Sequence, residues 1–317
     1  MAFGIGPVGR LFSRDKVLDS KLLNIMGAQV FRALVARLAY KIRHPAVPDD
    51  VADRVAELNR EGIVVLRDFL PPDRFERVRA ECAWLDTQPD QIETFQHGPT
   101  TLKAVAIRNF SERVLPSIYG FYNDPRLRGI VTAAEQRPVN LLEAGEREYL
   151  THGEAGGESG GEADPQTELH SDIFFNTHKA WFYLDDVRRE DGPLVYVKGS
   201  HRLTLARLGF VYRDSWKRKP GSDPSRRIAP DEQRRCQADE TVLTCARNTL
   251  VVVNTCGYHR RLQGRPGRKR YALHLSVRGN PFAPHSLRSS MARHARFYDF
   301  LRRAKKAWRG RASEAVR

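Results

Sequence analysis

A series of short β-branched segments separated by turns limits the fold of this chain more strongly than any other feature of its sequence. The predicted strands are 180–184, 194–197, 249–253 and 271–277. Several short strands with turn signals between them are typical of a β-sandwich or β-barrel. One long insert, 213–239, is rich in charged residues, Pro and Ser. We expect this insert to lie outside the barrel.

The N-terminal part is predicted to be largely helical. Between residues 20 and 43, apolar side chains recur at steps of three and four, which places them on one face of a helix that ends before Pro45. They are Leu23, Met26, Val30, Leu34 and Leu38. A β-branched run at 62–66 predicts a strand that leads into a helix, and 138–142 predicts another strand. Five glycines within 153–161 predict a mobile surface loop.

The net charge of +15 is concentrated at the C-terminal end. Residues 260–317 hold 17 Lys or Arg and only two acids, and the segment from residue 284 onwards is predicted to form a basic amphipathic helix. The simplest interpretation is a solvated face. The alternative is that this helix contacts an anionic membrane surface, which would then be a partner of the protein. Nucleic acid is not favoured, because no base-reading module appears in the sequence.

The sequence predicts a cytoplasmic location, with peripheral contact at the inner membrane face if the basic tail binds lipid. The N-terminus lacks the pattern of a secretory signal, and the longest uncharged, mostly apolar stretch, 22–31, is too short to span a bilayer. No pair of cysteines has the two-residue spacing of a zinc or redox motif. We therefore interpret Cys82, Cys236, Cys245 and Cys256 as thiols of a reducing compartment.

Two histidines and one aspartate form the candidate metal site. His170 and Asp172 are two residues apart, so on a strand both side chains point to the same face. His259 follows a hydrophobic strand after a turn at Gly257. Two imidazoles and one carboxylate leave three coordination positions open, which suits Fe(II) when a chelating cosubstrate and dioxygen must both bind.

A chelating keto acid also needs a partner for its far carboxylate. Arginine suits this role because its planar guanidinium donates two parallel hydrogen bonds and keeps its charge when buried. Arg270, 11 residues after His259, is the candidate, and Arg268 is the reserve because it would share a strand face with Arg270.

These segments together resemble the phytanoyl-CoA dioxygenase family of iron and 2-oxoglutarate oxygenases over roughly residues 55–280. The resemblance depends on several motifs in the same order along the chain. They are Gly62 to Leu70, His170-Ser171-Asp172, Ala180-Trp181, Leu184 to Val187, Asp191 to Leu194, Val197 to Arg202, His259 and Arg270.

The resemblance implies a mainly β fold with flanking helices, namely a double-stranded β-helix (a cupin-like jelly roll). It implies Fe(II) as the metal, bound by His170, Asp172 and His259, which are the catalytic residues. It further implies that Arg270 binds 2-oxoglutarate and that Trp181 lies near the cosubstrate pocket. The implied reaction is hydroxylation with release of succinate and CO2.

We expect one oxygenase domain at 51–283, between an N-terminal helical extension at 1–50 and the basic helix at 284–317. The expected substrate is a small molecule or a lipid- or sugar-linked metabolite, and the sequence identifies neither the substrate nor the oligomeric state. Two alternatives remain open: the same chemistry on nucleic acid, and a barrel without catalysis that serves as a binding or scaffold protein.

Overall fold

Two antiparallel sheets and a set of covering helices make up the fold. The computed structural model describes residues 11–12, 18, 20–42, 46–154, 163–217, 226–228 and 240–282. The strands are β1 (Ile63–Leu66), β2 (Glu93–His97), β3 (Thr100–Ala106), β4 (Gly145–His152), β5 (His170–Ser171), β6 (His178–Tyr183), β7 (Leu194–Val197), β8 (Arg226–Arg227), β9 (Glu240–Val242), β10 (Thr249–Asn254), β11 (His259–Arg261) and β12 (Lys269–Val277). The helices are α2 (Lys21–Ile25), α3 (Ala28–Ile42), α4 (Ala52–Glu61), α5 (Pro72–Leu85), α6 (Pro116–Tyr122), α7 (Pro125–Glu135) and α8 (Leu205–Lys217).

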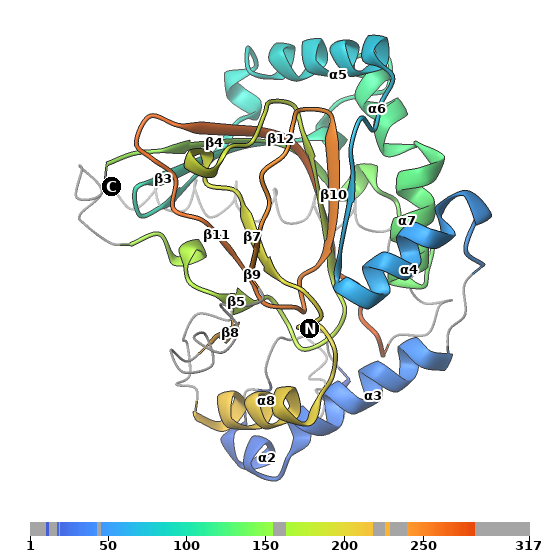
Figure 1. Cartoon of the computed structure of the whole chain (residues 1–317), viewed down its shortest axis with the longest axis vertical. Coiled ribbons are helices and arrows are strands. Elements are labelled where there is room, and N and C mark those ends of the chain that lie inside the picture. Colours follow the sequence, from blue (N-terminus) through green and yellow to red (C-terminus); the bar gives the residue numbers. More distant parts are fainter. Residues whose placement is uncertain are drawn as a thin grey trace, which may run out of the picture.

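The chain passes repeatedly from one sheet to the other. The larger sheet has the order β1-β10-β6-β12-β4-β3-β2, and the smaller has the order β8-β5-β11-β7-β9. From β4 to β7 successive strands alternate between the sheets, and from β9 to β12 they alternate again (Figure 1). This is the strand arrangement of a double-stranded β-helix, so the predicted jelly roll is confirmed.

Helices cover the outer face of the larger sheet and create the main hydrophobic core. In β6, Ala180 and Phe182 face these helices, and Phe182 is stacked on Phe121 of α6 with ring centroids 4.7 Å apart. The alternate residues of β6, Lys179 and Trp181, face the interior of the barrel, where they line a pocket. The two-residue period of the strand thus separates a structural face from a functional face.

Gly62 makes the short connection between α4 and β1. Its φ is +80°, a left-handed conformation that glycine adopts without steric cost, and its backbone N–H caps α4 by donating to Leu58. A Cβ at this position would lie 2.2 Å from the hydroxyl of Tyr196. A glycine is therefore required both by the backbone and by the packing of the barrel.

The predicted N-terminal helix is present in two parts. It breaks at Gly27, where φ is +88°, so α2 and α3 are separate helices instead of one. The inner side of α3 packs on the barrel through Ala33, Ala36 and Tyr40. Among the described residues, no helix combines the length and the apolar character that crossing a bilayer would require.

Two predictions about the middle of the chain were wrong. Residues 138–142 form no strand; the strand of this region is β4, which starts at Gly145. The polar insert 213–239 does not lie wholly outside the barrel, because its first residues complete α8 and β8 pairs with β5 at the edge of the smaller sheet. Residues 155–162 of the predicted glycine-rich loop and the predicted C-terminal helix lie outside the described residues.

His201, in the turn after β7, should make the fold sensitive to acid. Its Nε2–H donates to the carbonyl of Asn59 (3.1 Å), and burial lowers its pKa to about 4. Because the unfolded imidazole has its ordinary pKa near 6.5, the unfolded state binds the proton first. The neutral imidazole of His201 therefore contributes to the free energy of unfolding. This contribution is complete above about pH 6.5 and is lost as the pH falls to about 4.

Replacing His201 by Gln keeps an N–H donor but removes the titration. We expect the wild type to lose about 2 kcal/mol more of its free energy of unfolding than His201→Gln between about pH 7 and pH 4. Urea unfolding of both proteins at several pH values measures this difference. Equal acid sensitivity in the two proteins would assign the effect to other groups.

Candidate metal centre

His170, Asp172 and His259 come together where β5 and β11 meet in the smaller sheet. The register pairs His170 directly with His259, and their rings are 4.5 Å apart. Asp172 follows β5 immediately, and its backbone N–H donates to the carbonyl of Thr255. A long-range strand pairing therefore assembles the three side chains that the sequence singled out.

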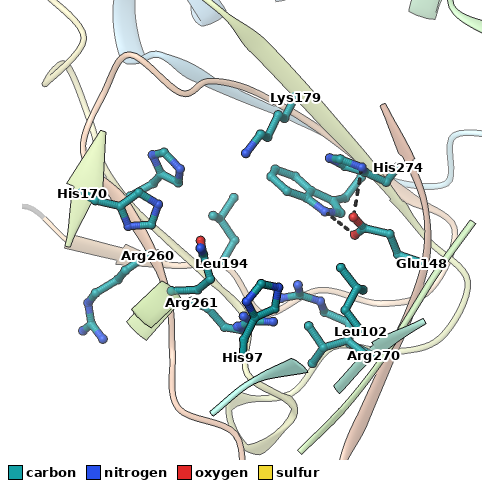
Figure 2. A pocket seen from close by; sticks show the side chains of 14 residues that line it. His97, Leu102, Glu148, His170, Lys179, Leu194, Arg260, Arg261, Arg270 and His274 are labelled. Carbon is teal, nitrogen blue, oxygen red and sulfur yellow. Dashed lines mark hydrogen bonds and ion pairs between the residues drawn. The ribbon is translucent and has the colours of Figure 1, made fainter. Parts of the chain in front are cut away.

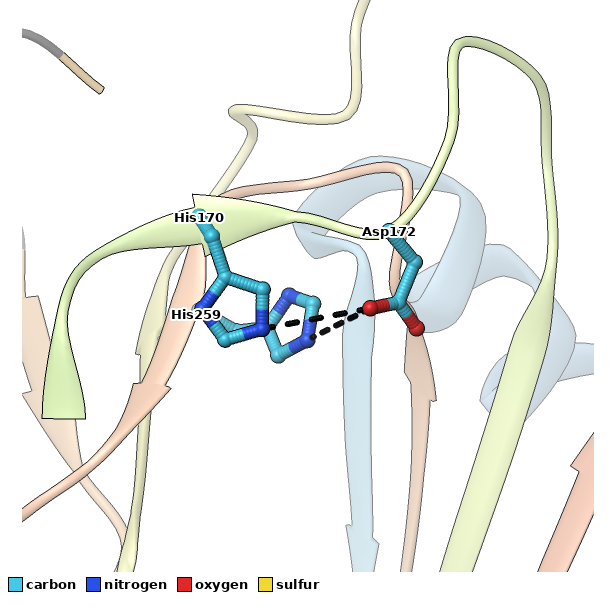
Figure 3. A group of neighbouring side chains, drawn as sticks. All are labelled: His170, Asp172 and His259. Atoms are coloured by element: carbon cyan, nitrogen blue, oxygen red, sulfur yellow. Dashed lines mark ion pairs between the residues drawn. The ribbon is translucent and has the colours of Figure 1, made fainter. Parts of the chain in front are cut away.

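The ligand atoms of the three residues converge on one point (Figure 3). Asp172 Oδ1 lies 3.9 Å from Nε2 of His170 and 3.7 Å from Nε2 of His259. All three side chains are buried, and their donor atoms lie within 4.8 Å of one another. Two imidazole nitrogens and a carboxylate oxygen form a set that fits a divalent transition metal, including Fe(II).

Backbone carbonyls fix the tautomer of both histidines. Nδ1 of His170 is 2.7 Å from the carbonyl of Glu168, and Nδ1 of His259 is 3.0 Å from the carbonyl of Gly257. Because a carbonyl only accepts, each Nδ1 carries the hydrogen and each Nε2 presents its lone pair toward Asp172. Burial lowers the pKa of His170 and lowers that of His259 to about 3, so both rings are neutral near pH 7.

Lys179 of β6 is a further member of this site that the sequence did not assign. Its Nζ lies 2.8 Å from Asp172 Oδ2, which leaves Oδ1 facing the two histidines. Burial alone would raise the pKa of Asp172, but the charge of Lys179 and the two imidazoles together hold it below its ordinary value. The carboxylate is therefore ionised and oriented for binding through one oxygen.

A pocket of about 180 Å³ extends from His170 and His259 into the barrel (Figure 2). Its lining mixes cationic, acidic and apolar side chains from both sheets. The lining residues are His97, Leu102, Glu148, Leu150, Gln166, His170, Lys179, Trp181, Leu194, His259, Arg260, Arg261, Arg270 and His274. A small polar ligand bound here would lie beside the metal centre.

Arg270 differs from the arginines around it in its partners. Arg260 pairs with Glu240, Arg261 with Asp164, and Arg268 with both Asp191 and Glu190. Arg270 donates from Nη1 to the carbonyl of Gly192 (2.6 Å), and within the described part of the chain no acidic side chain forms an ion pair with it. Arg268 does not line the pocket. An uncompensated guanidinium in a pocket is suited to bind an anion.

Trp181 lines the pocket together with two polar residues that the sequence did not assign to it. Its Nε1–H donates to Glu148 Oε2 (3.2 Å), and its ring lies over His274 with centroids 5.1 Å apart. Nδ1 of His274 is 3.0 Å from Glu148 Oε1. Glu146, Glu148 and His274 form a second group of potential metal ligands in the described chain. Glu148, however, already accepts a hydrogen bond from Trp181.

Comparison with known proteins identifies relatives of this fold. A family model described as phytanoyl-CoA dioxygenase (PhyH) matches residues 58–245. This span contains His170 and Asp172 and ends before His259 and Arg270. A search of curated protein sequences found no match.

Two solved structures illustrate the similarity of fold. The epimerase SnoN, solved in complex with Fe3+, alpha ketoglutarate and nogalamycin RO, has a TM-score of 0.52 and 16% identity, covering 72% of this chain and 83% of its own. EctD from S. alaskensis, solved with 2-oxoglutarate and 5-hydroxyectoine, has a TM-score of 0.50 and 14% identity, covering 76% of this chain and 84% of its own.

Proposed function

The chain belongs to the phytanoyl-CoA dioxygenase family, and on that premise we propose that it is an Fe(II)- and 2-oxoglutarate-dependent dioxygenase. The proposed reaction is hydroxylation of a small-molecule or lipid- or sugar-linked metabolite, with release of succinate and CO2. The observation that carries this proposal is the convergence of three metal-ligand atoms beside a pocket that contains an uncompensated arginine.

The roles of individual residues follow from their positions. His170, Asp172 and His259 would hold the metal through two Nε2 atoms and Oδ1, and Lys179 would keep Asp172 in this orientation. When bound, Fe(II) with 2-oxoglutarate and dioxygen supplies the oxidising power that breaks a substrate C–H bond. Arg270 would donate hydrogen bonds to the far carboxylate of 2-oxoglutarate. Trp181 and Leu194, which line the same pocket, would limit access of water.

An anaerobic titration tests the cofactor assignment directly. Fe(II) is added to the protein with and without 2-oxoglutarate, and the visible charge-transfer absorption of the chelated metal is recorded. We expect this band only when both components are present, and we expect it to vanish in His170→Ala. A folded, metal-loaded protein without the band would overturn the proposal and favour a scaffold protein.

The type of reaction is distinguished by product analysis. A hydroxylase adds one oxygen atom to its substrate, whereas an epimerase such as the similar structure SnoN leaves the substrate mass unchanged. Tracing ¹⁸O from dioxygen into the product separates these outcomes. Stimulation of 2-oxoglutarate turnover by DNA or RNA would instead favour the nucleic-acid alternative.

We further propose a cytoplasmic location with peripheral contact to the inner membrane face. A buried free thiol at Cys82 and a partly buried one at Cys245 support a reducing compartment. The basic tail, 284–317, was the predicted contact with anionic lipid, but it lies outside the described residues.

A further inference from the structure

Helices α2 and α3 present an apolar face to solvent. Seven of the fourteen large apolar side chains exposed by the described residues lie between Leu22 and Ile42, and each is between 46% and 74% exposed. They are Leu22, Ile25, Met26, Phe31, Leu34, Leu38 and Ile42. The last four recur at steps of three and four, so they form one stripe along α3. We call these seven side chains the α2–α3 face.

The opposite side of both helices is anchored to the rest of the protein. Tyr40 donates a hydrogen bond to the carbonyl of Asn176 (3.0 Å), and Asn24 donates to the carbonyl of Ser215 in α8 (3.1 Å). The three helices lie together at one end of the molecule (Figure 1). Turning the apolar stripe inward would break these contacts, so its exposure is a consequence of the fold.

The charges carried by helices α2 and α3 themselves are of one sign. No acidic residue occurs between Asp19 and Asp49, whereas Lys21, Arg37 and Lys41 are exposed on the two helices. Covering the face with the basic segment 283–317, or with the same face of a second copy, would bring like charges together. A partner that is both apolar and anionic matches this surface.

We propose that the α2–α3 face docks on a bilayer that contains anionic lipids. The stripe of Phe31, Leu34, Leu38 and Ile42 enters the boundary between headgroups and acyl chains, and the flanking lysines and arginine contact phosphate groups. An exposed apolar surface of this extent on one pair of helices is typical of an interaction site and unusual for free solvent exposure.

Helix α3 lies next to the segment that follows Asp172, so docking through α3 would also place the metal centre close to the bilayer. The inner side of α3 packs on Ile173, Phe174 and Phe175, which directly follow Asp172. A bilayer bound to the outer side would lie about one helix diameter, roughly 10–12 Å, from this segment. Docking would thus hold the metal centre near the membrane surface, where lipid-linked molecules are concentrated. That consequence depends on the proposed function, whereas the docking itself does not.

Vesicle cosedimentation of the full chain tests the docking. We expect binding to mixed phosphatidylglycerol and phosphatidylcholine vesicles, weaker binding at high salt, and little binding to phosphatidylcholine alone. The double variant Leu34→Glu/Leu38→Glu should lose about tenfold or more in affinity. The control Phe95→Glu/Val114→Glu adds the same charge at side chains that are 43% and 45% exposed outside this face. The control should bind within about twofold of wild type.

Three results would overturn the proposal. The first is a wild type that does not sediment with anionic vesicles. The second is a face variant that sediments like the wild type, which would assign the binding to another segment such as 283–317. The third is a wild-type dimer that the face variant converts to a monomer in light scattering. Because no iron or 2-oxoglutarate is present in these experiments, each of these results leaves the oxygenase proposal unaffected.

Circular dichroism and a thermal melt confirm that both double variants are folded. A second measurement locates the contact by fluorescence. Brominated lipids should quench the added tryptophan of Phe31→Trp and should not quench that of Val114→Trp. Equal quenching in the two variants would contradict docking through the α2–α3 face.

Discussion

Replacing Asp172 by Ala is expected to weaken Fe(II) binding by about a thousandfold or more, roughly 4 kcal/mol, and to abolish turnover of 2-oxoglutarate. The substitution removes the one anionic ligand among three. It also leaves the ammonium group of Lys179, now 2.8 Å from Asp172 Oδ2, without its partner beside the metal. A neighbouring unpaired cation would repel Fe(II), so the loss should exceed that from removing a neutral ligand.

Isothermal titration with Fe(II) under anaerobic conditions measures this loss. Asp185→Ala is the matched control, because Asp185 is a partly exposed aspartate paired with Arg79 at 3.5 Å. It should bind metal like the wild type. The double variant Asp172→Ala/Lys179→Met separates the two contributions, and we expect it to recover part of the affinity. Unchanged Fe(II) affinity in Asp172→Ala would show that the metal binds elsewhere, with Glu146, Glu148 and His274 as the next candidate.

The sequence predicted strands that contain a run of apolar residues and missed β4, in which charged residues interrupt that run. β7 is apolar along its whole length and β10 is apolar from Leu250 to Val253, and both were found. β4 was missed because Glu146, Arg147 and Glu148 conceal its strand character. Glu148 lines the pocket, while Arg147 is buried on the other face with Asp86 as its ion partner. Polar residues placed for function weaken the pattern by which a strand is recognised.

The candidate site was predictable only in part, for a similar reason. The spacing of His170 and Asp172 is local, because two residues on an extended chain share a face. The contact of Asp172 with Lys179 joins the two sheets, and that of His274 with Glu148 depends on the pairing of β12 with β4. The periodicity of α3 likewise predicted an apolar stripe that contains Leu34 and Leu38. It did not predict that this stripe is exposed to solvent. Contacts between segments that are far apart in the sequence decide these features. Such contacts leave no local pattern in the sequence.

Arg270→Ala should raise the dissociation constant of 2-oxoglutarate by about 100-fold or more, with little effect on metal binding. Two charge-assisted hydrogen bonds to a carboxylate contribute roughly 1.5–3 kcal/mol each, so losing both would remove about 3 kcal/mol or more. The expected signature is a charge-transfer band that still forms but requires a much higher 2-oxoglutarate concentration. Arg270→Lys should recover only part of this affinity, because an ammonium group lacks the planar pair of donors.

Arg268→Ala is the control that makes this result specific to the pocket. Arg268 is two residues away on the chain, but it pairs with Asp191 (2.7 Å) and Glu190 (3.7 Å) and does not line the pocket. Arg268→Ala removes the same charge as Arg270→Ala, at a position only two residues away. A purely electrostatic effect would therefore appear in both variants. We expect only Arg270→Ala to lose 2-oxoglutarate affinity. If Arg268→Ala lost as much, the effect would be electrostatic and not specific to Arg270. If Arg270→Ala bound 2-oxoglutarate normally, another cation of the pocket, Arg261 first, would have to hold the far carboxylate.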